Sequence, residues 1–320
     1  MSTAIYNKTA GDLIRAALRD ASIVAVGIPI QGEDWSIAES TLNDVLSHWQ
    51  AKLGINLWRE TEALLPLNPD QIEYDLGPDG DHCFTDYAYA TTTLIRSTMD
   101  STLFVSPADG AAIIAAGFGS TGGENIGIEL DDGTRFWTFM DVSPGLSGGG
   151  IQIYDGLPSG AAVGSSIYIY RNAIDRPVRV LDVRHSFSQT TNETPVLQTS
   201  RQQYYQTPNK TDSSSSVTEW YYSPQLELGK FSVWPPASTC KNILRFTFVK
   251  PQYIPEDQSE NILIPNEWFL PLKWALASEL GVTYAIASDR LVMIENKAAT
   301  SLDAAMSNDV EVDYFSIQPD

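Results

Sequence analysis

Few side chains in this chain are of a type that could do acid–base or nucleophilic chemistry. The 320 residues include three histidines and two cysteines: His48, His82, His185, Cys83 and Cys240. His82 and Cys83 are adjacent and Asp86 follows, which would suit a thiol nucleophile or a metal ligand set. Adjacent side chains diverge in a strand, however, and no second cluster of ligand residues completes such a site. The cysteines lack metal-ligand spacing, so we expect two buried free thiols.

Two further stretches invite a chemical interpretation. Gly117 to Gly123 is rich in glycine, but it lacks the Gly-Lys-Ser/Thr that holds phosphate, and we expect a connection between strands. Asp131-Asp132-Gly133 would suit calcium or paired acid–base catalysis, yet it lies between two alternating runs and is typical of a hairpin turn. We expect His48 to be solvated on a helix and His185 to lie at the surface. The sequence therefore predicts no catalytic residue, no metal and no cofactor, and a protein that is not an enzyme.

The overall charge restricts the partners. Twenty Lys and Arg residues stand against forty Asp and Glu residues, a net charge of -20. Such a molecule repels free nucleic acid and anionic membranes. No segment approaches the ~18 uninterrupted apolar residues of a membrane span, and the first 25 residues lack the pattern of a signal peptide. We expect a soluble protein made in the cytoplasm, with no membrane partner.

One stretch is net basic. Residues 171–185 contain Arg171, Arg176, Arg179 and Arg184 against only Asp175 and Asp182. These arginines could contact DNA phosphates or pair with acidic residues of a neighbouring subunit, and the second use fits so acidic a protein better. By contrast, residues 253–320 carry twelve acidic and three basic residues. An acidic wall of this kind would let DNA pass without binding it.

Hydrophobic periodicity predicts four helices that could position these residues. Residues 9–23 and 36–53 each carry an apolar stripe at intervals of three and four. Thr9 or Asp12 would cap the first helix. Ser36 with Glu39 forms a capping-box pattern at the start of the second, for which Asp34 is the alternative cap. Further helices are expected over 266–284, with a kink or later start at Pro271, and over 288–306. A short helix begun by Ser200 is also expected.

The remaining pattern is that of strands. Short alternating runs separated by turns fill residues 78–170, with no helical stripe, which predicts a small β-barrel or sandwich. Strands are also expected at 57–67, 72–77, 176–184 and 243–249, and a hairpin at 219–234. The chain ends in an extended apolar segment containing Val310, Val312, Tyr314, Phe315 and Ile317. This segment adds a strand either to its own sheet or to a partner.

Several motifs occur in an order that resembles a known family. Ser-x-Ala-Glu-x-x-Leu-Asn-x-x-Leu-x-x-Trp at 36–49 precedes Trp-Arg-Glu at 58–60 and Leu-Pro-Leu-x-Pro-x-Gln-x-x-Tyr-x-Leu-Gly at 65–77. Arg-Pro-x-Arg-Val at 176–180, Pro-Asn-Lys at 208–210, Trp-Tyr-Tyr-x-Pro-Gln at 220–225 and Val-Trp-Pro at 233–235 follow. This order is similar to that of the head-to-tail adaptors, or head-completion proteins, of short-tailed bacteriophages. The resemblance covers residues 9–77 and 174–295, about three fifths of the chain.

The resemblance implies a structural virion protein at the head–tail junction, assembled in the host cytoplasm. It implies a ring of twelve copies below the portal protein, contact with the tail nozzle, tail fibres or spikes, and a channel for double-stranded DNA. By position, it assigns portal binding to residues 288–320, including Val310, Val312, Tyr314, Phe315 and Ile317.

The expected organisation is α+β. Residues 1–78 and 173–287 would form the adaptor core, a helical bundle with a small antiparallel β-region. Residues 79–172 would form an inserted all-β domain, and residues 288–320 a C-terminal helix and extended arm. An alternative function is a tail-associated binding module whose inserted domain recognises a fibre, a glycan or the host surface. Trp137, Tyr154, Tyr168 and Tyr170 could then stack on sugars, or pack in the core of the domain.

Overall fold

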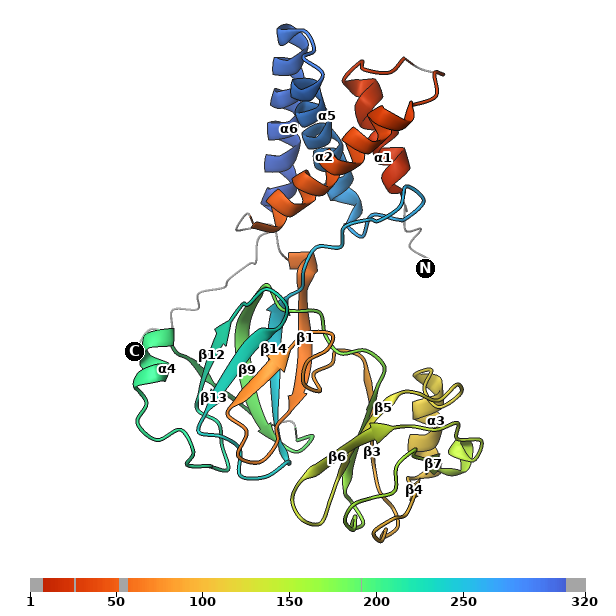
Figure 1. Cartoon of the computed structure of the whole chain (residues 1–320), viewed down its shortest axis with the longest axis vertical. Helices are drawn as coiled ribbons and strands as arrows, with labels where there is room; N and C mark the ends of the chain where they lie inside the picture. The colour runs from red at the N-terminus through yellow and green to blue at the C-terminus, as the bar shows by residue number, and fades with distance from the viewer. Residues whose placement is uncertain (1–7, 26, 52–56, 191, 309–320) are drawn as a thin grey trace, which may run out of the picture. The chain divides into compact units, whose positions relative to one another are not determined.

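The chain folds as an α+β protein, which confirms the predicted class (Figure 1). The computed structural model describes residues 8–25, 27–51, 57–190 and 192–308. These residues contain six α-helices and four sheets, and their neighbouring strands are mostly antiparallel, with β11 and β12 as a parallel pair. The chain divides into two compact units, one formed by residues 1–60 and 251–320 and the other by residues 61–250.

The helices fall in both units. The first unit contains α1 (Ala10–Asp20), α2 (Gly32–Ala51), α5 (Phe269–Thr283), α6 (Ser288–Asn308) and the 3-10 turns η1 (Leu57–Arg59) and η3 (Asn266–Trp268). The second contains α3 (Pro107–Ala115), α4 (Arg201–Gln206) and the 3-10 turn η2 (Leu146–Gly148).

The helical unit is built around one apolar core. The predicted stripe of α2 is buried through Ala38, Leu42, Val45, Leu46 and Trp49, and that of α1 through Leu13, Ile14, Ala17 and Leu18. These residues share the core with Leu272, Leu276 and Leu280 of α5 and with Ile294 and Ala305 of α6. The ring of Trp268 contacts those of Trp49 and Trp58 at centroid distances of 5.6 and 4.7 Å. The first-unit helices are therefore held together by the faces that the periodicity predicts.

Two helix starts differ from expectation in opposite ways. Helix α2 begins at Gly32, so Ser36 and Glu39 lie inside it and the predicted capping box is wrong. Glu33 and Asp34 lie in the first turn of α2, where their negative charge interacts favourably with the helix dipole. Helix α5 begins at Phe269, later than the expected residue 266, because a 3-10 turn precedes it; Pro271 falls in its first turn, where no amide donor is needed.

The second unit is built from strands. They are β1 (Glu60–Pro66), β2 (Glu73–Leu76), β3 (Tyr87–Thr91), β4 (Thr102–Phe104), β5 (Asn125–Glu129), β6 (Arg135–Phe139), β7 (Gly150–Gln152), β8 (Ser166–Tyr170), β9 (Arg179–Phe187), β10 (Glu193–Pro195), β11 (Leu197–Gln198), β12 (Glu219–Ser223), β13 (Gly229–Trp234) and β14 (Asn242–Val249). The sheet orders are β1-β14-β9-β10, β11-β12-β13-β2, β3-β8-β5-β6 and β4-β7. The predicted strand at 57–67 is shorter than expected, since residues 57–59 form η1.

Residues 87–170 build their own sheets and their own core. Strands β3 to β8 pair only with one another among the named strands. Their core contains Leu103, Ile113, Ile126, Ile151 and Ile167, all below 1% exposed. Helix α3 also belongs to this region, so the prediction of an all-β domain is wrong. The side chain of Ser106 accepts a hydrogen bond from the Asp109 amide, and Pro107 occupies the first turn, a start signal that the search for an apolar stripe missed.

The unit boundaries differ from the expected domain boundaries. Residues 61–78 and 173–250, which the sequence assigned to the same domain as the helices, lie in one compact unit with residues 79–172. Helix α6, expected in a separate C-terminal element, packs in the core of the helical unit through Ile294 and Ala305.

Candidate protein-interaction site

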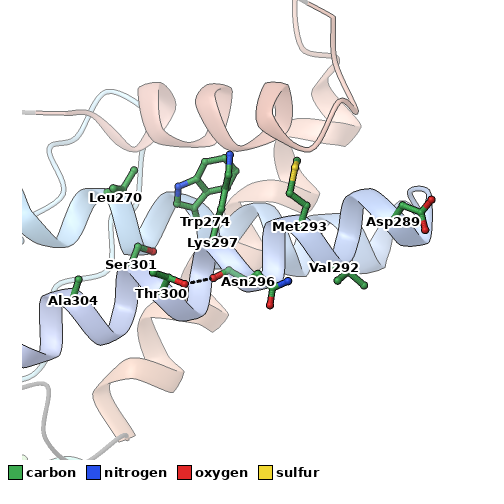
Figure 2. Close-up of a pocket in the computed structure, with 10 residues that line it drawn as sticks. All are labelled: Leu270, Trp274, Asp289, Val292, Met293, Asn296, Lys297, Thr300, Ser301 and Ala304. Carbon is green, nitrogen blue, oxygen red and sulfur yellow. Dashed lines mark hydrogen bonds between the residues drawn. The ribbon is translucent and has the colours of Figure 1, made fainter.

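An apolar groove runs along helices α5 and α6 of the helical unit (Figure 2). It has a volume of about 770 Å³ and opens to solvent. Its walls are formed by Leu270 and Trp274 of α5 and by Asp289, Val292, Met293, Asn296, Lys297, Thr300, Ser301 and Ala304 of α6. We refer to these ten residues as the α5–α6 groove.

The spacing of residues on α6 explains why a groove forms there. The groove residues of α6 recur every three or four positions, so they share one face of the helix. A different face carries Ile294 and Ala305, which are 0% and 4% exposed in the core. Helix α6 therefore has a buried apolar face and a separate face along the groove, on which Val292, Met293 and Ala304 lie among polar residues.

The groove retains a large exposed apolar surface. Leu270, Val292 and Met293 are 53%, 54% and 45% exposed, although each is a large hydrophobic side chain. Exposed apolar side chains gathered along one groove indicate a candidate site of protein interaction. The groove thus has the character of a surface that binds another polypeptide segment.

Two lysine side chains lie against the indole ring of Trp274 in the groove. The Nζ atoms of Lys273 and Lys297 lie 4.3 and 4.5 Å from its ring centroid, within the range of a cation–π contact. Lys273 also pairs with Asp20 at 2.7 Å. Within the described part of the chain, no carboxylate lies within ion-pair distance of Lys297. An acidic, partly aromatic ligand would complement both the indole and this lysine.

The sequence contained a signal for this groove that the helical periodicity did not use. The predicted stripe of the helix over 266–284 consisted of Trp268, Leu272, Ala275, Leu276 and Leu280, of which all but the half-buried Ala275 are buried. Leu270 and Trp274 lie off that stripe, as do Val292 and Met293 off the buried face of α6. Large apolar residues outside the core stripe were the available indication of a second contact face.

Val310, Val312, Tyr314, Phe315 and Ile317 lie outside the described residues, which end at Asn308. Their assignment to a partner therefore stays a prediction.

Two of the four predicted interface arginines have acidic partners within the second unit. Arg171 pairs with the buried carboxylate of Glu124 at 3.1 Å and donates to the Gly117 carbonyl. Arg184 lies between Glu62, Asp182 and Glu193, at 3.0, 3.1 and 3.0 Å. These carboxylates raise the pKa of Arg184 above its ordinary value, against the opposing effect of burial.

Arg176 and Arg179 are the other two. Arg179 is the exposed first residue of β9, and Arg176 is half-buried close enough to Tyr222 to influence its ionisation. The structure does not bring the four arginines to one common acidic cluster. Contact with DNA or with a neighbouring subunit stays a prediction for each of them.

His82 lies in an aromatic environment in the second unit. Its ring stacks on Trp137 with a centroid distance of 3.8 Å, and Nδ1 lies 2.6 Å from the Tyr170 hydroxyl. Burial, and to a smaller extent the charge of Arg135, lowers the pKa of His82 to about 4. The imidazole is therefore neutral at pH 7 and acts as a packing and hydrogen-bonding group.

The predicted exposure is wrong for one of the other two histidines and confirmed for the second histidine and both cysteines. His185 is 5% exposed and shares a 2.8 Å hydrogen bond with Asn242, so the prediction of a surface position is wrong. Strand β9 lies between β14 and β10, and these neighbours cover His185, which follows the strand predicted at 176–184. His48 is exposed as expected. Cys83 and Cys240 are buried and unpaired, as predicted, and burial raises the pKa of both thiols.

The aromatic residues considered for sugar stacking are mostly interior. Tyr168 and Tyr170 are 1% and 3% exposed, and Trp137 is half-buried against His82. Tyr154 alone among the four is well exposed, at 76%. The packing interpretation therefore holds for three of them.

The hairpin interpretation of Asp131-Asp132-Gly133 is confirmed. Strands β5 and β6 pair through Glu129 and Arg135 on either side of the turn. Asp132 accepts hydrogen bonds from the amide and hydroxyl of Thr134, and these bonds lower its pKa. Among the described residues no group of three or more His, Cys, Asp or Glu side chains is placed to hold a metal ion.

Searches for related proteins do not assign the chain to a family. Neither the comparison with known protein families nor that with curated proteins gives a match. In the described part of the chain, no helix is long and apolar enough to cross a membrane.

Proposed function

We propose that this chain is a structural head-to-tail adaptor of a short-tailed bacteriophage. Twelve copies would form a ring between the portal protein and the tail, at the head–tail junction of the virion. Residues 288–320 would bind the portal, and tail nozzle, fibre or spike proteins would bind elsewhere on the ring. The role is one of assembly and not of catalysis.

The observation that carries the proposal is the pairing of β2 with β13. The Tyr74-Asp-Leu-Gly77 motif and the Val-Trp-Pro hairpin are separated by about 150 residues, yet Phe231 lies opposite Tyr74 and Gly229 opposite Leu76 in one sheet. The motifs that resemble those of adaptors are therefore neighbours in space as well as in order. This is what an adaptor β-region interrupted by an inserted module requires.

Within this proposal, residues 79–172 are the inserted module and α1, α2, α5 and α6 the helical bundle of the adaptor. The separate core of residues 87–170 supports the first assignment, and the shared core of the four helices supports the second. The exposed α5–α6 groove supplies a surface on which a partner could bind. The acidic composition favours passage of double-stranded DNA without binding.

The test is native mass spectrometry of the full chain, alone and mixed with the portal protein of the same phage. We expect the mixture to give a complex that carries twelve copies on the portal ring, and the variant Met293→Asp to weaken it. Glu295→Gln, an exposed change on α6 outside the groove, is the matched control. Absence of any association with the portal, or hydrolysis of a glycan by the chain alone, would overturn the proposal.

A second candidate is recognition of a fibre, a glycan or the host surface by the inserted module. Tyr154 donates its amide to the Phe139 carbonyl at 2.9 Å, and both side chains are more than half exposed. This aromatic pair is suited to an apolar or sugar contact. Binding of the purified chain to tail fibres or to host glycans, lost in Tyr154→Ala and kept in Tyr205→Ala, would favour this role. Equal binding by both variants would exclude the pair.

A further inference from the structure

The α5–α6 groove has no cover within the described part of the helical unit, and the chain continues past one of its ends. The groove reaches Ala304, and α6 ends four residues later at Asn308. Twelve residues, Asp309 to Asp320, follow. We propose that this C-terminal segment folds back and docks in the α5–α6 groove of its own molecule.

The segment is long enough to reach Lys297, which lies over Trp274 in the groove. At about 1.5 Å per helical residue, Thr300 lies about 12 Å and Lys297 about 16 Å from the end of α6. Extended chain advances about 3.3 Å per residue. After a reversal of about three residues, Tyr314 to Ile317 come level with Thr300 and Lys297. Asn308 and Asp309 are residues that favour a chain reversal.

The chemistry of the segment matches that of the groove. Val310, Val312, Tyr314, Phe315 and Ile317 supply apolar surface for the exposed halves of Leu270, Val292 and Met293. An aromatic ring from the segment would contact the indole of Trp274.

The charges also match. The segment carries Asp309, Glu311, Asp313 and Asp320 and no basic residue. Lys297 has no carboxylate within ion-pair distance in the described residues and lies over Trp274 at 4.5 Å. An acidic residue beside the aromatic pair of the segment would give Lys297 its counter-charge.

Docking within one molecule is favoured over docking on a second copy by the connection itself. A segment tethered directly to the end of α6 has an effective concentration on the order of millimolar near the groove. A second copy at micromolar concentration competes poorly with it. The short tether therefore favours the C-terminal segment of the same molecule as the occupant of the groove.

This docking does not depend on the proposed function.

Cysteine pairs in the full chain test the docking. Thr300 and Ala299 are adjacent and exposed on α6, but only Thr300 lines the groove. Thr300→Cys with Ser316→Cys should form an intramolecular disulfide under mild oxidation at least tenfold faster than Ala299→Cys with Ser316→Cys. Peptide mass spectrometry identifies the bond. Cys83 and Cys240 are 0% and 1% exposed and remain outside the reaction.

A third variant probes the groove itself. Trp274→Ala, added to the Thr300 pair, should lower its rate to that of the Ala299 pair. Equal rates for the two pairs, or a Thr300 rate unaffected by Trp274→Ala, would overturn the proposal. A covalent dimer in place of the intramolecular bond would overturn it as well and assign the groove to a second copy. No portal is present, so failure here is distinct from failure of portal binding in the mass-spectrometric test.

Discussion

The Nδ1 atom of His82 lies 2.6 Å from the hydroxyl oxygen of Tyr170, in a setting that keeps the imidazole neutral. His82 belongs to the connection between β2 and β3, whereas Tyr170 ends β8. Trp137 of β6 completes the arrangement by stacking on the imidazole. These contacts attach the β2–β3 connection to the sheet formed by β3, β8, β5 and β6. Changes in the protonation of His82 should therefore affect the free energy of unfolding of the second unit.

We expect His82 to make the stability of the second unit depend on pH. The pKa of a histidine in an unfolded chain is about 6.5, whereas burial lowers that of His82 to about 4. Between these values the unfolded chain binds a proton that the folded protein does not. The free energy of unfolding therefore falls as the pH falls, by about 2 kcal/mol between pH 7 and pH 5 from this residue.

Urea denaturation followed by tryptophan fluorescence at both pH values measures this effect. His82→Gln should remove that part of the pH dependence, and His48→Gln controls for loss of an exposed imidazole. If the wild-type protein and His82→Gln lose stability equally on acidification, the neutral buried imidazole is the wrong explanation.

Gly127 is expected to tolerate no side chain. A Cβ atom there would lie 2.4 Å from the Trp137 ring, which would have to leave its stack on His82. We expect Gly127→Ala to destabilise the protein by about 2 kcal/mol, within the range for overpacked sites. Gly148→Ala is the control, since nothing lies within 4 Å of its added atom and its φ is not positive. Thermal unfolding of the two variants compares them, and equal melting temperatures would contradict the steric argument.

The pair of Arg171 and Glu124 joins an exposed cation to a buried anion. Glu124 is 1% exposed and also accepts the Gly119 amide at 3.3 Å. Arg171→Met should leave this carboxylate without its counter-charge and cost about 2 kcal/mol of unfolding free energy. Removing both charges, with Glu124→Gln added, should recover most of the loss. A double-mutant cycle by urea denaturation measures the coupling, and a value near zero would show that the pair contributes nothing.

The hydroxyl of Tyr284 donates to the Asp34 carboxylate at 2.7 Å and so connects the end of α5 to α2. Burial and this carboxylate raise the pKa of Tyr284 to about 12. The stabilisation is therefore present below pH 10 and is lost as the pH rises toward 12.

Tyr284→Phe should cost about 0.5–1 kcal/mol at neutral pH, the usual worth of one hydrogen bond. It should also make the melting temperature less sensitive to pH between 9 and 11. Tyr205→Phe, at an exposed tyrosine of α4, is the matched control. An effect of Tyr284→Phe no larger than that of the control would show that the bond is not stabilising.

Several elements could be predicted from the sequence because their determinants are local. The stripe of α1 and the Thr9 cap lie within a few residues of one another, and the Thr9 side chain accepts the Asp12 amide as such a cap does. The short helix expected to begin at Ser200 is likewise set within one turn, where the structure shows a capping box of Ser200 with Gln203. The turn at Asp131-Asp132-Gly133 is set by residues that favour it wherever they occur.

Other features depend on contacts between residues far apart in the sequence, and only the tertiary structure decided them. His185 is buried because β14 and β10 lie on either side of β9, which its own neighbours do not reveal. The start of α2 depends on packing and charge along a longer helix than the Ser36 pattern implied. The α5–α6 groove remains open because the core of the helical unit takes up a different face of α6, the one that carries Ile294 and Ala305. A short-range pattern predicts which residues share a face, but burial of that face depends on which distant segment packs against it.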